Sequence, residues 1–153
     1  MTSTAAKLGS WRPLLRVSSA AWLGEHDGDE GALWVGSDLV ARRPIDPDLP
    51  VGCLPLLERP YGDVQDELTR TPGCGAATRA ALSRVVPAGV IEAAFHLGSA
   101  HWLAGACAWV EHLGPSEQTR GWARRLETTT AAGQSTRHRA HRLRGHWSVD
   151  QEA

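Results

Sequence analysis

Five prolines crowd residues 42–60 of this 153-residue chain, and they constrain its fold more than any other feature. They are Pro44, Pro47, Pro50, Pro55 and Pro60. Proline fixes φ and removes a backbone donor, and it also restricts the residue before it. We therefore predict an irregular crossing here, with the regular secondary structure in the two halves on either side.

The first half is expected to contain strands. Two apolar runs, residues 14–23 and 32–41, flank the polar segment 24–31, which is rich in Gly, Asp and Glu. This pattern predicts a β-hairpin with a long loop, although the first run could also form a short helix. The acidic residues 27–30 resemble the start of a calcium loop. However, Gly31 and Ala32 stand where that loop needs a carboxylate and a glycine, so we interpret the segment as an acidic hairpin loop.

The second half is expected to contain helices. The patterns predict a helix over 63–70, a second over 74–86, rich in Ala and Leu, and a third that begins after Ser116 and ends near Thr128. Ser116 is a good N-cap, because its hydroxyl can accept a hydrogen bond from an unpaired amide in the first helical turn.

Residues 90–113 fit two alternatives. They could form two strands, 90–97 and 103–113, or one long helix, and the periodicity does not decide between them. We expect an α+β fold, because strands and helices do not alternate along the chain. It would comprise a strand-rich N-terminal half, then a helix packed on a small antiparallel sheet, and a C-terminal helix.

The length is that of one domain with a hydrophobic core. We assign residues 1–132 to a single globular domain. Residues 133–153 form a tail rich in Arg and His, and chain ends of this kind are often disordered. Seven tryptophans stand against one Phe and one Tyr, so we expect Trp rings to fill much of the core.

The net charge, the cysteine count and the apolar stretches limit which partners and which cellular compartment we expect. The net charge of −1 gives no overall drive toward nucleic acid, and we do not expect a nucleic-acid partner. The three cysteines, an odd number, argue against a disulfide framework, and no signal-peptide pattern opens the chain, so we expect a cytoplasmic protein. The apolar stretch 85–110 contains Glu92, His96 and His101, which are costly in a bilayer, so we expect buried core and no membrane, with a membrane span as the alternative.

The sharpest pattern is a series of short motifs in the second half. In chain order these are Cys74 at the start of a predicted helix, residues 87–90 (Pro-Ala-Gly-Val), Gly98, residues 107–111 (Cys-Ala-Trp-Val-Glu), Gly121 with Trp122, and residues 127–129 (Glu-Thr-Thr). This order resembles the transglutaminase-like core, which includes the leader peptidases of lasso-peptide maturation. In that family a nucleophilic Cys begins a helix, and a later strand carries a His followed by Ala and Trp.

The resemblance implies thiol chemistry, either as a peptidase or as an acyl transferase acting on a peptide. Cys74 would be the nucleophile, activated at a helix N-terminus, and Glu127 would orient the base. The chain departs from the family at the His position, where Cys107 stands, and at the carboxylate, which is Glu rather than Asp. A thiol does not readily replace imidazole as a base, so His101 is the candidate, with His112 as the other nearby histidine.

Two alternatives compete with this enzyme hypothesis. The first is a non-catalytic binding or regulatory protein, including a degenerate relative of the transglutaminase-like fold that has lost its histidine. It predicts either a Trp-lined apolar patch or a structured basic tail that serves a partner. The second is contact with nucleic acid through residues 137–147, where four arginines alternate with histidines. The spacing of His138 and His141 is a weak metal signal, and we expect neither a metal nor a cofactor.

Overall fold

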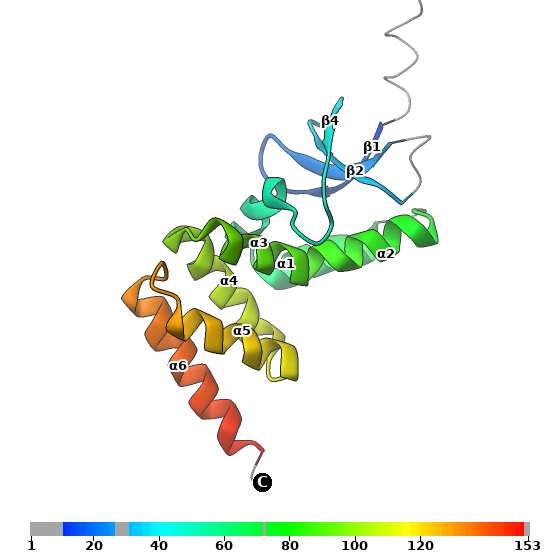
Figure 1. Ribbon diagram of the computed structural model, residues 1–153. Helices are drawn as coiled ribbons and strands as arrows, with labels where there is room; N and C mark the ends of the chain where they lie inside the picture. Colours follow the sequence, from blue (N-terminus) through cyan, green and yellow to red (C-terminus); the bar gives the residue numbers. More distant parts are fainter. Residues whose placement is uncertain (1–10, 27–30, 72, 152–153) are drawn as a thin grey trace, which may run out of the picture. The chain divides into compact units, whose positions relative to one another are not determined.

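The computed structural model describes residues 11–26, 31–71 and 73–151 (Figure 1). Its contacts divide the chain into two compact units, the first ending at Ala93 and the second beginning at Ala94. The predicted α+β class is confirmed, because an antiparallel sheet in the N-terminal half is followed by helices.

The first unit contains a four-stranded antiparallel sheet. Its strands are β1 (Trp11–Arg16), β2 (Trp22–His26), β3 (Leu33–Gly36) and β4 (Ala41–Pro44), in the order β1-β2-β3-β4. A hairpin is present as the β2–β3 pair, in which Leu23 lies opposite Val35, but the predicted bounds are wrong. The run 14–23 spans the end of β1, a turn and the start of β2, and β2 extends through Gly24 and Glu25 of the predicted loop. The acidic residues 27–30 fall outside the described residues.

The two faces of the sheet differ in side-chain chemistry. Leu15, Leu23, Leu33 and Val35 share one face and are buried. Trp11, Trp22 and Trp34 lie on the opposite face and are only half-buried, because successive side chains along a strand point to opposite sides. The expectation that Trp fills the core is therefore wrong for these three residues.

Gly24 has a steric reason to be glycine. A Cβ at this position would meet the carbonyl oxygen of Arg12 and the ring of Trp11. The indole N–H of Trp11 donates to the Ser37 carbonyl at 2.9 Å, which fixes the ring across this face of the sheet.

The outer edge of β1 is closed by side chains. The backbone N–H of Arg16 donates to Glu67 at 2.8 Å, and Arg59 donates to the Arg16 carbonyl at 2.5 Å. Thr71 donates to the Leu14 carbonyl at 3.2 Å. Glu67 lies on α1 (Tyr61–Arg70), so this helix satisfies backbone groups that would otherwise be open to another strand.

The proline-rich crossing is more ordered than predicted. The prediction of no regular structure over 42–60 is wrong, because β4 ends at Pro44 and a 3₁₀ helix, η2 (Val51–Glu58), contains Pro55. Proline is tolerated at the end of an edge strand. The four buried apolar residues of η2 supply the packing that stabilises it; they are Cys53, Leu54, Leu56 and Leu57.

A bent helical run follows. It comprises α2 (Ala76–Arg84), a bent turn, η3 (Val85–Gly89), and α3 (Val90–Leu97), and the division between the two units falls within α3. Val86 has extended backbone angles (φ −119°, ψ 119°), as expected for a residue before proline. Among the described residues, this run, Ala76–Leu97, is long and apolar enough to cross a membrane by length and composition, and half of it is buried within the protein.

Residues 90–113 form two helices, α3 and α4 (Ala100–Leu113). The two-strand alternative is wrong, and the single-helix alternative is interrupted at Gly98, whose φ of +68° ends α3. The buried residues Leu103, Ala106, Cys107 and Val110 follow helical spacing, so one side of α4 packs inward.

The second unit continues with α5 (Glu117–Thr128) and α6 (Gln134–Val149). The predicted cap is confirmed: the Ser116 hydroxyl accepts from the Thr119 N–H at 3.1 Å, and the Thr119 hydroxyl accepts from the Ser116 N–H at 2.8 Å. Trp109, Trp122 and Trp147 are buried in this unit, so here tryptophan does fill the core.

The segment expected to be a basic tail forms α6 instead. It packs inward with Thr136, Ala140 and Trp147, which are all buried. Together with Leu143 they recur at helical spacing, a pattern that the sequence contained and that the density of Arg and His obscured. The tail therefore belongs to the second unit rather than standing apart from residues 1–132.

Replacing Gly89 by Ala should destabilise the first unit by about 1–3 kcal/mol. The new methyl group would meet the carbonyl oxygens of Pro47 and Arg84. Gly121→Ala, within α5, is the control: its methyl meets nothing within 4 Å, and it should stabilise the helix by about 0.5–1 kcal/mol. Urea unfolding followed by circular dichroism measures both. A Gly89→Ala protein as stable as the parent would contradict this close packing.

Candidate functional site

Cys74 lies two residues before α2, in the first unit. Its side chain is half-buried and lines a hollow of about 350 Å³ between α1 and α2. The other lining residues include Tyr61, Gln65, Thr69, Arg79 and Ser83. The predicted position near a helix start is therefore present, and Arg79 of α2 lines the same hollow.

The hollow lacks the base that acyl transfer requires. No histidine is among its lining residues in the part of the chain that the structure describes. Tyr61 is a poor substitute, because burial raises the pKa of its hydroxyl. A thiol proton at Cys74 thus has no imidazole acceptor within the first unit's hollow.

The other two predicted catalytic residues belong to the second unit. His101 is exposed on α4, with its ring 4.6 Å from the ring of Trp102. Glu127, on α5, accepts from His141 Nδ1 at 2.7 Å and from Arg144. The hydrogen bonds from His141 and then Arg144 lower the pKa of Glu127. Its carboxylate is therefore engaged with α6 rather than with His101.

Cys107 stands where the resemblance places the family's histidine. The resemblance implies a strand there, and that expectation is wrong, since Cys107 is buried within α4. Burial raises the pKa of the Cys107 thiol, and its sulfur lies 4.0 Å from the Thr136 carbonyl oxygen. Cys107 is thus a packing residue between α4 and α6.

The surface that sequence reasoning undervalued is α6. Over Gln134–Val149 it carries four Arg, three His and no Asp or Glu. Two of the arginines form ion pairs: Arg139 pairs with Glu111 of α4, and Arg144 pairs with Glu127 of α5. These pairs tie α6 to the two helices that it packs against.

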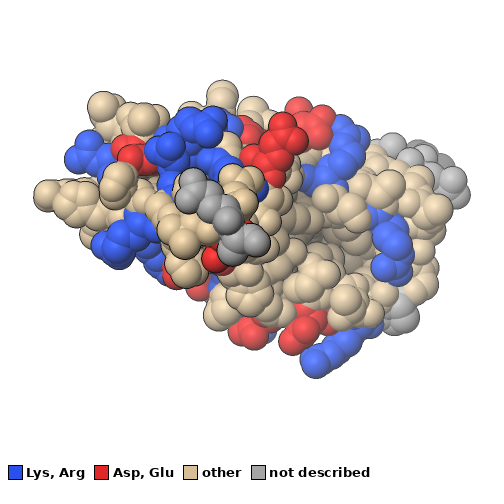
Figure 2. All heavy atoms as spheres, turned by 90° about the horizontal axis from the view of Figure 1, so that it is seen from below, with Lys and Arg blue, Asp and Glu red and all other residues tan. Residues whose placement is uncertain are grey.

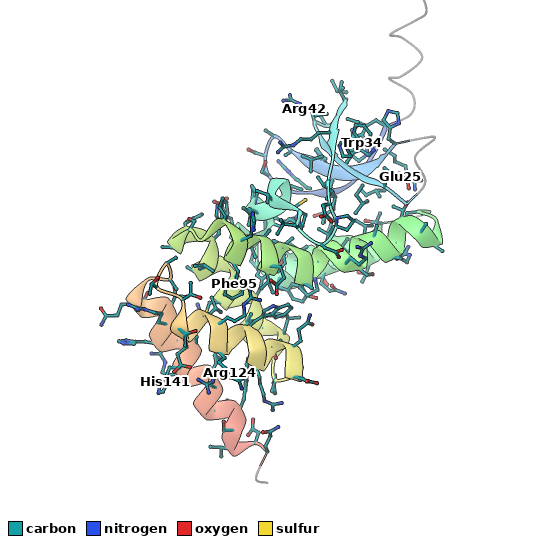
Figure 3. All side chains as sticks on the ribbon, in the orientation of Figure 1. Glu25, Trp34, Arg42, Phe95, Arg124 and His141 are labelled. Atoms are coloured by element: carbon teal, nitrogen blue, oxygen red, sulfur yellow. The ribbon has the colours of Figure 1, made fainter. Side chains whose placement is uncertain are left out.

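The other Arg and His side chains of α6 are exposed, except that Arg137 is half-buried, and His141 also contacts Glu127. Arg137, His138, His141, Arg142 and His146, which we call the basic stripe, recur every four or five residues and so follow one side of the helix. Arg137 and Arg142 form no ion pair with any described residue, and the His141 side chain is 74% exposed (Figure 3). A shallow hollow of about 380 Å³ lies at the start of the stripe, lined by Glu127, Gln134, Arg137, His138 and His141.

Helix α5 adds to this surface. Arg124 is exposed and projects from α5 beside α6 (Figure 3), and neither Arg124 nor Arg120 forms an ion pair in the described part of the chain. Arg125 differs, because its guanidinium lies 3.9 Å from the centre of the Phe95 ring.

Comparison of the chain with family models, with curated proteins and with solved structures finds no match. Within residues 11–26, 31–71 and 73–151, no three His, Cys, Asp or Glu side chains gather to hold a metal ion.

We expect only Cys74 to react with a thiol-alkylating probe in the folded protein. Cys53 and Cys107 are buried, and burial raises the pKa of Cys53 to about 12, so its thiol stays protonated. Mass spectrometry of the native and denatured protein identifies the labelled residues, with Cys74→Ala as control. Fast labelling of Cys74 down to about pH 5 would support the thiol hypothesis. Labelling only in alkali would end it.

Glu127→Gln should lower stability by about 1 kcal/mol or less at neutral pH. The hydrogen bonds from His141 and Arg144 lower the pKa of Glu127 in the folded protein. Their stabilisation is therefore complete at a pH above the usual pKa of 4.5, and it is lost as the pH falls through the lowered pKa. The difference from the parent should therefore shrink in acid, as measured by thermal unfolding across pH. Asp66→Asn, an exposed change on α1, is the control. A difference that persists in strong acid would contradict the ionic origin.

Proposed function

We propose that this protein is a non-catalytic binding protein that holds an anionic partner through the basic stripe of α6. One observation carries the proposal: a folded helix presents Arg137 and Arg142, without ion pairs among the described residues, next to three histidines. Ordered Arg groups donate several hydrogen bonds in a fixed geometry, which suits anionic oxygens.

The inner face of α6 supports binding by holding the outer face in place. Thr136, Ala140 and Trp147 are buried, and the pairs with Glu111 and Glu127 add charged contacts on the same side. A helix that is already ordered loses less conformational entropy when it binds than a flexible tail does. The stripe is therefore better suited to a partner than the same residues in a disordered segment.

The charge of the chain is divided unequally. Residues 94–153 carry seven arginines against five acidic residues, whereas residues 1–93 carry nine basic residues against twelve acidic ones. Figure 2 shows Lys and Arg side chains gathered in patches, some of them bordered by Asp or Glu. The overall charge of −1 thus hides a basic second unit.

The enzyme hypothesis has less support. The hollow at Cys74 contains a thiol and a guanidinium but no imidazole among its described lining residues, and Glu127 serves α6. A peptidase needs nucleophile, base and orienting group within reach of one another. The thiol hypothesis remains a prediction, tested by the labelling of Cys74.

The binding proposal predicts that the protein binds heparin, a generic polyanion, in a salt-dependent manner. Changing both Arg137 and Arg142 to Gln should weaken binding about tenfold or more, because each lost charged contact is worth roughly 1 kcal/mol. Fluorescence anisotropy of a labelled heparin fragment measures the affinity.

The matched control changes Arg42 and Arg70 to Gln. Both are exposed on the first unit, and the pair removes the same charge. Equal weakening by the two double variants would show that net charge, rather than the stripe, governs binding. Absence of heparin binding would overturn the proposal.

A further inference from the structure

We infer that the anionic partner of the basic stripe is double-stranded nucleic acid, contacted along its phosphate backbone with α6 at a groove. This inference rests on the binding function proposed above and names the class of its partner.

The stripe consists of hydrogen-bond donors. From Arg137 to His146 the exposed side chains are His138, His141, Arg142 and His146, with Gly145 among them. Arg and His donate hydrogen bonds to phosphate oxygens and to base edges. No carboxylate interrupts them on α6, so phosphates meet no repulsion from the helix itself.

Apolar groups, which a bilayer would need, are scarce on this side. A helix that lies in a membrane interface buries a face of large apolar residues. Among the described residues of α6, the exposed large apolar side chain is Val149, at the helix end. An anionic lipid surface is therefore a poorer match to the stripe than a nucleic acid.

The burial of the aromatic residues favours a duplex over a single strand as the partner. Single-strand binding relies on exposed rings against which bases stack. On α6 itself the only ring besides histidine is Trp147, which is 4% exposed, so the stripe offers no such platform; the half-buried Trp102 lies on α4. Backbone contact with a duplex does not require one.

The dimensions also fit a duplex. An α-helix with its side chains is about 10–12 Å wide, close to the roughly 12 Å width of the major groove. Gly145 has no side chain, and a Cβ added there would meet nothing within 4 Å, so the helix surface is open at this position.

The test titrates the full-length protein into a labelled duplex of roughly 20 base pairs, or about two helical turns. Anisotropy is measured between about 50 and 200 mM salt. The same strand alone and vesicles containing phosphatidylserine are the comparison ligands. We expect tightest binding to the duplex. A plot of log affinity against log salt concentration has a negative slope. The Arg137→Gln and Arg142→Gln double variant should reduce the magnitude of this slope by about 2, whereas the Arg42 and Arg70 control should leave it unchanged.

Gly145 offers a second, paired test on a surface with room for a side chain. Gly145→Glu should weaken duplex binding, and Gly145→Arg should strengthen it, with circular dichroism to verify the fold. Equal or tighter binding of the single strand or the vesicles would overturn the duplex inference while heparin binding kept the proposed function. Loss of heparin binding as well would overturn both.

Discussion

The inner contacts of α6 determine what its outer surface can do. Arg139 and Arg144 are paired with Glu111 and Glu127, and Trp147 is buried beneath the same helix. Exposed ion pairs contribute little to stability by themselves, so the buried tryptophan supplies most of the attachment. The pairs add orientation: Arg139 and Arg144 flank the buried side of α6, and their contacts with Glu111 and Glu127 leave Arg137 and Arg142 without ion pairs among the described residues.

The first unit is organised around the protection of its sheet. Arg59, Glu67 and Thr71 satisfy the free edge of β1, and Thr78 of α2 donates to Glu25 of β2 at 2.8 Å. Glu25 also pairs with Arg12, so a charged residue on the otherwise apolar face has partners. The hollow at Cys74 lies where α1 and α2 approach each other, and its shape follows from helices already placed by the sheet.

The sequence predicted the parts of the fold whose causes are local. Ser116 caps α5 because its own side chain satisfies an amide three residues later. The polar segment 24–31 correctly indicated a reversal of the chain, but β2 extends into it because Gly24 and Glu25 pair with β3. Residues 90–113 were ambiguous because their apolar residues support either period, and only packing distinguishes them. For α6 the spacing of Ala140, Leu143 and Trp147 was present, yet it becomes decisive only when Glu111 and Glu127, from other helices, neutralise the adjacent arginines.

The candidate site shows a similar limit, for an electrostatic reason. The net charge of −1 predicts no nucleic-acid partner, but it sums over groups that a bound partner does not sense equally. Charges separated by more than about 8 Å are largely screened at physiological salt. A phosphate at Arg142 therefore responds to the stripe and its immediate neighbours. Because Glu111 and Glu127 are already paired with Arg139 and Arg144, the local balance around Arg137 and Arg142 is positive even in a chain whose total is −1.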